Sequence, residues 1–139
     1  MGQKIYINLP VTDLEVSKAF YAQLGYGFNP LYTNDVAACM VVSDDIHVML
    51  LTKPFFATFT QKEIADTQKS AQVMLCLGKD NREEVDMLVD KAIAAGAKIE
   101  RPINDHGFMY ERSFNDPDGN IWEIMWLDED AYKTLKSKS

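Results

Sequence analysis

Few side chains in this sequence combine acid–base or metal-binding chemistry with an apolar setting. Glu123 lies inside the strand-like segment 121–127, which is rich in aromatic and aliphatic residues. A carboxylate in such a setting must be paired with a cation, hydrogen-bonded or protonated. Glu123 is therefore the best candidate for a catalytic, ligand-contacting or metal-binding group. The structural alternative is an ion pair with Arg112 or with another basic residue on the neighbouring strand.

The two histidines, His47 and His106, are the other candidates for acid–base or metal chemistry. Side chains alternate along a strand, so His47 points away from any cleft that Leu50 faces, and we expect it at the surface or at a sheet edge. His106 lies in the polar loop 104–107, where a solvated role is the simpler interpretation. A metal site built from both histidines and Glu123 would need that loop to reach inward.

The segment 108–114 alternates aromatic and charged residues. Tyr110 and Arg112 share one predicted face with two phenylalanines, and an arginine between aromatic rings can contact an anion or a π system. The alternative is a half-solvated strand in which Arg112 pairs with Glu111 or Glu123.

The cysteines and methionines are interpreted first as packing residues. Cys39 and Cys76 lie in apolar surroundings and form no Cys-x-x-Cys motif, which predicts two buried free thiols. Thioethers on predicted strands fill a core or line a pocket for an irregular apolar ligand, and they occur at Met40, Met49, Met74, Met109 and Met125. The sequence shows no Ser-His-Asp order, Gly-rich phosphate loop or zinc-type cysteine set.

The bulk composition indicates one globular domain. The chain has 139 residues, 47% hydrophobic, with 14 Lys plus Arg against 21 Asp plus Glu and a net charge of −7. Such a surface repels phosphate backbones and anionic membranes, so neither nucleic acid nor a membrane is an expected partner. We find no signal peptide and no apolar run near the length of a membrane span, and we expect a cytoplasmic protein.

The elements that must position these side chains follow the order β, α, β, β, β. Residues 5–9 alternate as a strand that Pro10 ends, Asp13 caps a helix that Gly25 stops, and three strand-like segments follow at 26–32, 36–42 and 46–51. The segment 53–70 breaks the pattern. It contains three phenylalanines and a polar run, and we interpret it as a linker with a short helix near 61–67.

The same order then restarts. A strand at 72–77 precedes a helix from Asn81 to Gly96, and strands follow at 98–101, 108–115 and 121–127, the last two joined by the turn 116–119. The pair Leu24-Gly25 corresponds to Ala95-Gly96, and 48–51 corresponds to 121–124. The fold class predicted is α+β, with two tandem βαβββ modules (about 4–52 and 71–127) whose mixed sheets face a central cleft, and a C-terminal surface helix at about 128–136.

Two motifs carry a family resemblance. The opening Asn8-Leu9-Pro10-Val11-Thr12-Asp13-Leu14, with Ser17, Phe20-Tyr21 and Leu24-Gly25 after it, resembles the start of vicinal-oxygen-chelate proteins, and so does Asp116-Pro117-Asp118-Gly119-Asn120-Ile121-Trp122-Glu123 near the end. This superfamily contains glyoxalases, bleomycin-resistance proteins and extradiol dioxygenases. The resemblance covers roughly residues 4–127 and is specific for fold rather than activity.

The resemblance also implies four positions at which metal-dependent relatives hold their ion. In this sequence they are Tyr6, Leu50, Gln72 and Glu123, and only Glu123 matches a ligand of the family. A carboxylate with an amide and a phenol is a poor donor set for a transition metal. We therefore expect no cofactor; a metal site, if present, would combine Glu123 with His106 or His47.

The expected function is the binding of a small, partly apolar molecule in the cleft, as in bleomycin-resistance proteins. The predicted ligand contacts are Tyr6, Leu50, Gln72, Tyr110, Arg112 and Glu123. The alternatives are a metal-dependent lyase (lactoylglutathione lyase-like) or dioxygenase with a shifted site using Glu123 and a histidine, or an interaction protein with a filled cleft. Relatives commonly dimerise, and the resemblance implies a homodimer.

Overall fold

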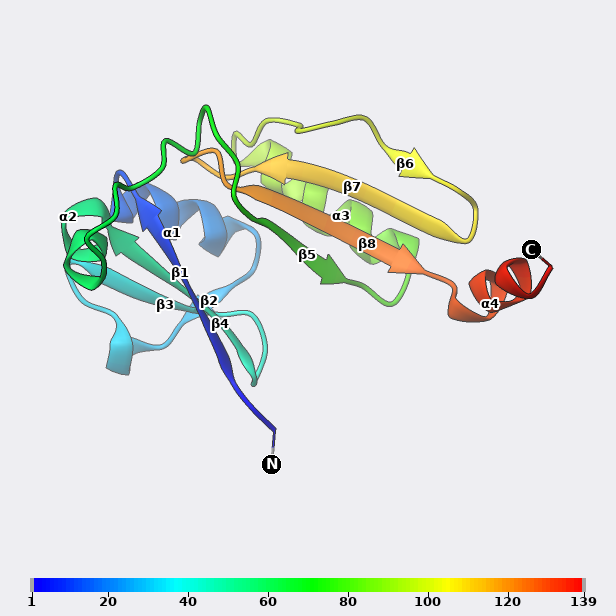
Figure 1. Ribbon diagram of the computed structural model, residues 1–139, viewed down its shortest axis with the longest axis horizontal. Helices are drawn as coiled ribbons and strands as arrows, with labels where there is room; N and C mark the ends of the chain where they lie inside the picture. Colours follow the sequence, from blue (N-terminus) through cyan, green and yellow to red (C-terminus); the bar gives the residue numbers. More distant parts are fainter. Residues whose placement is uncertain (1, 139) are drawn as a thin grey trace. The chain divides into compact units, whose positions relative to one another are not determined.

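The computed structural model describes residues 2–138 (Figure 1). The chain divides into two compact units at the junction between Ser70 and Ala71. Within each unit a helix lies against one face of a four-stranded sheet. In the described residues no helix is long and apolar enough to cross a membrane.

The first unit contains one mixed sheet and its helix. Its elements are β1 (Ile5–Val11), α1 (Leu14–Gln23), β2 (Gly27–Phe28), the 3-10 turn η1 (Pro30–Tyr32), β3 (Ala37–Val41), β4 (Ile46–Thr52), α2 (Lys53–Phe56) and η2 (Ala57–Phe59). The strand order is β1-β4-β3-β2. β1 runs parallel to β4, and the other neighbours are antiparallel. Pro10 does not end β1, which continues to Val11.

The second unit repeats this arrangement. Its elements are β5 (Met74–Gly78), α3 (Arg82–Ala94), β6 (Asn104–Asp105), β7 (Met109–Asn115), β8 (Ile121–Leu127) and α4 (Glu129–Ser137). The strand order is β5-β8-β7-β6, with β5 parallel to β8. Both units therefore have the βαβββ order, and the predicted α+β fold with two tandem modules is confirmed.

The two main helices begin and end in the same way. Asp13 and Asn81 are the N-caps, and each side chain accepts hydrogen bonds from backbone N–H groups of the first turn. Gly25 and Gly96 follow the helices with φ of 102° and 99°, a conformation that costs glycine little. In both, the N–H of the residue after glycine donates to a carbonyl five residues back, at 3.2 Å and 2.9 Å. The caps read from the sequence are confirmed.

Three element predictions are wrong. The segment 98–101 forms only an isolated bridge between Lys98 and Asn115, and the edge strand β6 lies further on. Pro102 has no N–H to donate, which disfavours a ladder at that place. The short helix expected near 61–67 lies instead at α2, where Pro54 occupies the first turn. The predicted strand 26–32 is reduced to β2, because Pro30 starts η1.

Each sheet has two chemically different faces. In the first unit Leu9, Val48 and Leu50 share the face that α1 covers, and they are 4%, 1% and 0% exposed. In the second unit Phe114, Trp122 and Ile124 face α3 and are equally buried. We call the opposite faces the α1-distal face and the α3-distal face.

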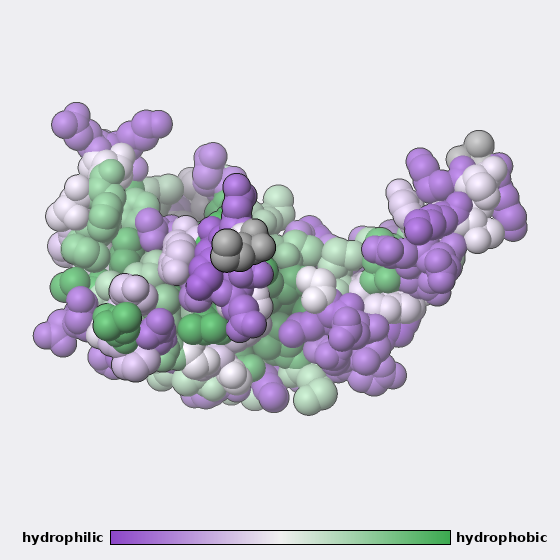
Figure 2. All heavy atoms as spheres, turned by 90° about the horizontal axis from the view of Figure 1, so that it is seen from below, coloured by the Kyte–Doolittle hydropathy of each residue, from purple (hydrophilic) through white to green (hydrophobic). Residues whose placement is uncertain are grey.

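The C-terminal helix α4 differs from the other two long helices. It has no buried residue, and hydrophilic colours dominate it in Figure 2. Asp128 caps its N-terminus by accepting from the N–H of Ala131 at 3.0 Å. This placement agrees with a polar surface helix at about 128–136.

Candidate functional site

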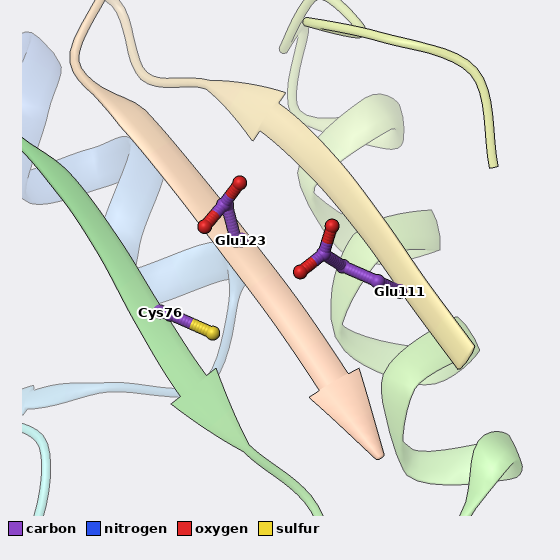
Figure 3. A group of neighbouring side chains, drawn as sticks. All are labelled: Cys76, Glu111 and Glu123. Carbon is purple, nitrogen blue, oxygen red and sulfur yellow. The ribbon is translucent and has the colours of Figure 1, made fainter. Parts of the chain in front are cut away.

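The α3-distal face of the second unit brings together three metal- or proton-binding side chains. Cys76 on β5, Glu123 on β8 and Glu111 on β7 come from adjacent strands, and all three side chains lie on one side of the sheet (Figure 3). Their ligand atoms lie within 4.8 Å of one another. The register explains the grouping, because Cys76 and Ser113 are both paired with Glu123, and Glu111 is two residues from Ser113.

A guanidinium pairs with both carboxylates of this cluster. Nη2 of Arg101 lies 2.5 Å from Oε2 of Glu123 and also forms an ion pair with Glu111. The carboxylate side chains are only 11% (Glu111) and 14% (Glu123) exposed, while the Arg101 side chain is 41% exposed. One cation therefore serves two largely covered anions and keeps part of its own surface toward solvent.

The backbone of Arg101 is held at the same place. Its N–H donates to Oγ of Ser113 at 3.2 Å, and Ser113 is 1% exposed. Lys98, three residues earlier, is bridged to Asn115 on β7. The segment that carries Arg101 thus follows the edge of β7, although it forms no regular strand there.

Cys76 belongs to this cluster as a thiol. The prediction that it is buried is wrong: Cys76 is exposed, whereas Cys39 is buried as expected. Desolvation by its neighbours raises the pKa of the Cys76 thiol, the charge of Glu123 raises it further, and Arg101 opposes them. A thiol with a raised pKa is a weak nucleophile at neutral pH.

Tyr110 and Arg112 do not join Glu123. They lie on the opposite, α3-facing side of β7, where both contact Asp86. The Tyr110 hydroxyl donates to Asp86 at 2.6 Å, and Nη1 of Arg112 donates to Asp86 at 2.8 Å and to Asp90 at 3.0 Å. The Tyr110 hydroxyl is the main cause of the lowered pKa of Asp86, and Arg112 lowers it further. These contacts hold α3 to the sheet, so the expected pairing of Arg112 with Glu123 is wrong.

In the first unit, His47 and Leu50 have exchanged their expected orientations. Leu50 lies on the α1-facing side, while His47 lies on the α1-distal face beside Tyr6. The rings of Tyr6 and His47 are stacked, with centroids 4.7 Å apart and planes 13° from parallel. The expected surface or edge position of His47 is wrong, because His47 is only 8% exposed and lies on β4, an inner strand of the sheet. Its Nδ1 has no hydrogen-bond partner among residues 2–138.

The expected orientations of His47 and Leu50 were wrong because the two modules were aligned in the wrong register. Leu9 pairs with Leu50, and Leu77 pairs with Ile124; both Leu9 and Leu77 precede the helix N-cap by four residues. Leu50 therefore corresponds to Ile124, not to Glu123, and the sequence correspondence between the modules was one residue out of register. A shift of one residue moves a side chain to the other face of a sheet.

His106 lies apart from the carboxylate cluster. His106 is exposed, stacks on Phe108 with ring centroids 5.9 Å apart, and donates its N–H to the carbonyl of Met109. Met109 is paired with Leu127, so this loop lies at the far end of β8 from Glu123, four residues or about 13 Å away. Gln72 is exposed and precedes β5.

The donor set does not fit a transition metal. In the corrected register, the position that matches Glu123 in the first module is Met49 rather than Leu50, and the position that matches Tyr6 in the second module is Met74 rather than Gln72. These positions offer two thioethers and the phenol of Tyr6. The fourth, Glu123, is ion-paired with Arg101. Cys76 and Glu111 add donors, but the same guanidinium pairs with Glu111.

Reasoning from sequence missed Arg101, Glu111 and Cys76 as one group. The turn 116–119 carried the necessary signal, because it fixes the pairing of β7 with β8. With Asn115 opposite Ile121, the alternation of side chains puts Glu111, Ser113 and Glu123 on one face and Arg112 on the other. Arg101 had no comparable signal, since it lies outside the ladder.

The comparisons with known proteins come from sequence and from structure. The sequence pattern of the Glyoxalase/Bleomycin resistance protein/Dioxygenase superfamily matches residues 5–124. No curated protein matches the chain.

Among solved structures, a hypothetical protein from S. aureus is 28% identical, with a TM-score of 0.76 over 91% of this chain and 94% of that one. A glyoxalase/bleomycin resistance protein/dioxygenase family enzyme from Burkholderia phytofirmans PsJN is 21% identical, with a TM-score of 0.76 over 91% and 99%. A lactoylglutathione lyase from Agrobacterium tumefaciens is 18% identical, with a TM-score of 0.64 over 91% and 94%.

Proposed function

Because the chain belongs to the glyoxalase/bleomycin resistance protein/dioxygenase superfamily, we propose that it binds a small, partly apolar molecule without the help of a metal ion. The binding surface would be the α3-distal face of the second unit. The observation that carries this proposal is a polar cluster of two carboxylates and one guanidinium set among exposed or half-exposed thioethers on one sheet face.

The apolar part of this surface is built from methionines. Three methionines point to the same side of the sheet as Cys76, Glu123 and Glu111, because each is an even number of residues from one of them along its strand. They are Met74 on β5, Met125 on β8 and Met109 on β7. Met74 is 56% exposed, and the other two are partly exposed. Thioether side chains adapt to irregular apolar shapes, and an exposed apolar patch is a common mark of a binding surface.

The polar part would orient the ligand. A guanidinium has five N–H donors, and the Arg101 side chain is 41% exposed, so donors remain for a neutral carbonyl or hydroxyl oxygen of a ligand. Glu111 and Glu123 fix the guanidinium in place, as positioned groups in a small-molecule site must be fixed. Of the ligand contacts expected from sequence, Glu123 belongs to this surface, while Leu50, Tyr110 and Arg112 lie on helix-facing sides.

The alternative function, a metal-dependent lyase or dioxygenase using Glu123 and a histidine, has less support. Within the second unit His106 lies at the other end of β8 from Glu123, and Glu123 itself is paired with Arg101. Such an enzyme would also need at least one further donor beside Glu123 that is free to bind an ion.

The test is a fragment screen against wild type and two matched variants, in the presence of EDTA. Ligand-observed NMR would select fragments that bear one apolar ring and one neutral acceptor, such as an amide or ketone oxygen. Met74→Glu should weaken their binding by about tenfold or more, because a buried contact with apolar surface is replaced by a charge. Met87→Glu is the control, since Met87 is 58% exposed but lies on α3.

Two results would contradict the proposal. One is that no fragment binds, or that both variants affect binding equally. The other is that lactoylglutathione forms at a rate that depends on added Ni²⁺ or Zn²⁺ and is lost on Glu123→Gln, which would support the metal-dependent lyase instead.

A further inference from the structure

The side chain of Arg101 pairs with both carboxylates of the one cluster of possible metal ligands found among residues 2–138. We propose that the guanidinium of Arg101 prevents divalent metal ions from binding to Cys76, Glu111 and Glu123. The inference rests on the proposed function in one respect, namely that ligand binding at this face needs no metal.

The charges of the cluster require a cation. Glu111 and Glu123 carry two carboxylates whose oxygens lie within the 4.8 Å of the cluster, and both side chains are less than 15% exposed. Like charges at that separation, poorly solvated, repel strongly unless a cation lies close to both. Arg101 supplies that cation within the chain, and a bound divalent ion would supply it from outside. The two cations compete because both would lie against the same two carboxylates.

Backbone contacts fix the position of Arg101 next to the two carboxylates. Its N–H is bonded to Ser113 Oγ, and the following residue is Pro102, which restricts the backbone of the residue before it. The backbone therefore holds the guanidinium close to the two carboxylates. A metal ion from solution would have to displace a tethered competitor of high effective concentration.

The donor chemistry indicates which ion would bind once the guanidinium is absent. One sulfur and two carboxylates, completed by water, form a four-coordinate set that suits Zn²⁺. Zn²⁺ also lowers the pKa of a thiol that it binds, so the Cys76 sulfur can become a ligand when the ion is present.

The experiment measures Zn²⁺ binding by isothermal titration calorimetry to chelator-treated protein at pH 7.5. Wild type should bind Zn²⁺ weakly. Arg101→Met, which keeps a side chain of similar length without charge, should bind one Zn²⁺ per chain about tenfold more tightly or better. The double variant R101M/E123Q should lose this gain. Arg82→Met is the matched control, because it removes a different exposed arginine–aspartate pair.

Arg101→Gln covers the case in which Arg101→Met does not fold, as judged by circular dichroism. Glutamine keeps N–H donors for the carboxylates but removes the charge, and the same gain in Zn²⁺ affinity is expected. The proposal is overturned if wild type binds Zn²⁺ as tightly as the folded Arg101 variants, or if these variants gain no affinity. The titration contains no organic ligand, so its failure is separate from a failure of the fragment screen.

Discussion

At the scale of single residues, the position of Glu123 was predictable and its partner was not. The apolar segment around it indicates a paired carboxylate, and an ion pair with a basic residue is one of the two interpretations that the sequence allows. Arg112 was the wrong choice because it pairs in register with Ile124 and faces α3. Arg101 lies ten residues before Glu111 in a segment without regular structure, where no periodicity shows the direction of a side chain.

His47 gives a prediction at the same scale. Its buried Nδ1 lacks a partner among the described residues, and such a group costs free energy of folding. His47→Phe keeps the flat ring that stacks on Tyr6 and removes the nitrogen. We expect the free energy of unfolding in urea at pH 7.5 to stay the same or to rise by about 1 kcal/mol.

The control for His47→Phe is His106→Phe, since His106 is an exposed loop residue. A surface substitution of this kind should change stability by no more than about 0.5 kcal/mol. A loss of about 2 kcal/mol in His47→Phe would show that Nδ1 has a hydrogen-bond partner in solution, and the assignment would then be wrong.

At the scale of elements, the loop between β6 and β7 is fastened to the start of α3. Arg82 donates to both carboxylate oxygens of Asp105, at 2.9 Å and 2.8 Å, and to the carbonyl of Gly107 at 3.1 Å. Its guanidinium also lies over the rings of Tyr110 and Trp126, 4.8 Å and 5.4 Å from their centroids. Hydrogen bonds from Arg82 and from the Gly107 N–H lower the pKa of Asp105 from 3.8 to about 2.

This lowered pKa predicts how the loop responds to acid. A carboxyl group with a lower pKa in the folded state stabilises the fold fully above its unfolded pKa of about 4, and the contribution is lost as the pH falls toward 2. Asp105→Asn should therefore have a lower thermal midpoint than wild type at pH 7. The difference should shrink between pH 4 and pH 2, measured by circular dichroism. A difference that persists unchanged at pH 2 would contradict the assignment.

The elements with strong local signals were the ones that could be predicted. The helices were marked by Asp13, Gly25, Asn81 and Gly96, whose side chains or backbone conformations act within one turn. The edge strand β6 and the turns of residues 53–59 could not be placed, because short edge elements depend on pairing with a neighbour that the local sequence does not specify. The orientation of Leu50 failed for a related reason, since register is a property of two strands together.

At the scale of the whole molecule, the doubled βαβββ unit was visible in the sequence because its caps and turns repeat. The family resemblance implies a homodimer, and this stays a prediction. Ile5 and Tyr6 in the first unit, and Met74 and Ile103 in the second, are each about half exposed, and we regard these apolar side chains as candidates for contacts between two copies of the chain. Light scattering coupled to size exclusion should give a mass near twice 15.8 kDa. A mass of one chain at the highest soluble concentration would contradict it.

The two units have the same strand order, yet their helix-distal faces carry different chemistry. The first has a stacked Tyr6–His47 pair, and the second has two carboxylates that share the guanidinium of Arg101. In evolutionary terms, a duplicated scaffold lets one copy change its reactive surface while the other keeps its own. Because Arg101 lies outside the strands, its codon can change without altering the ladder. If Arg101 excludes metal ions as proposed, a single substitution at this position would change the metal affinity of the face without changing the sheet.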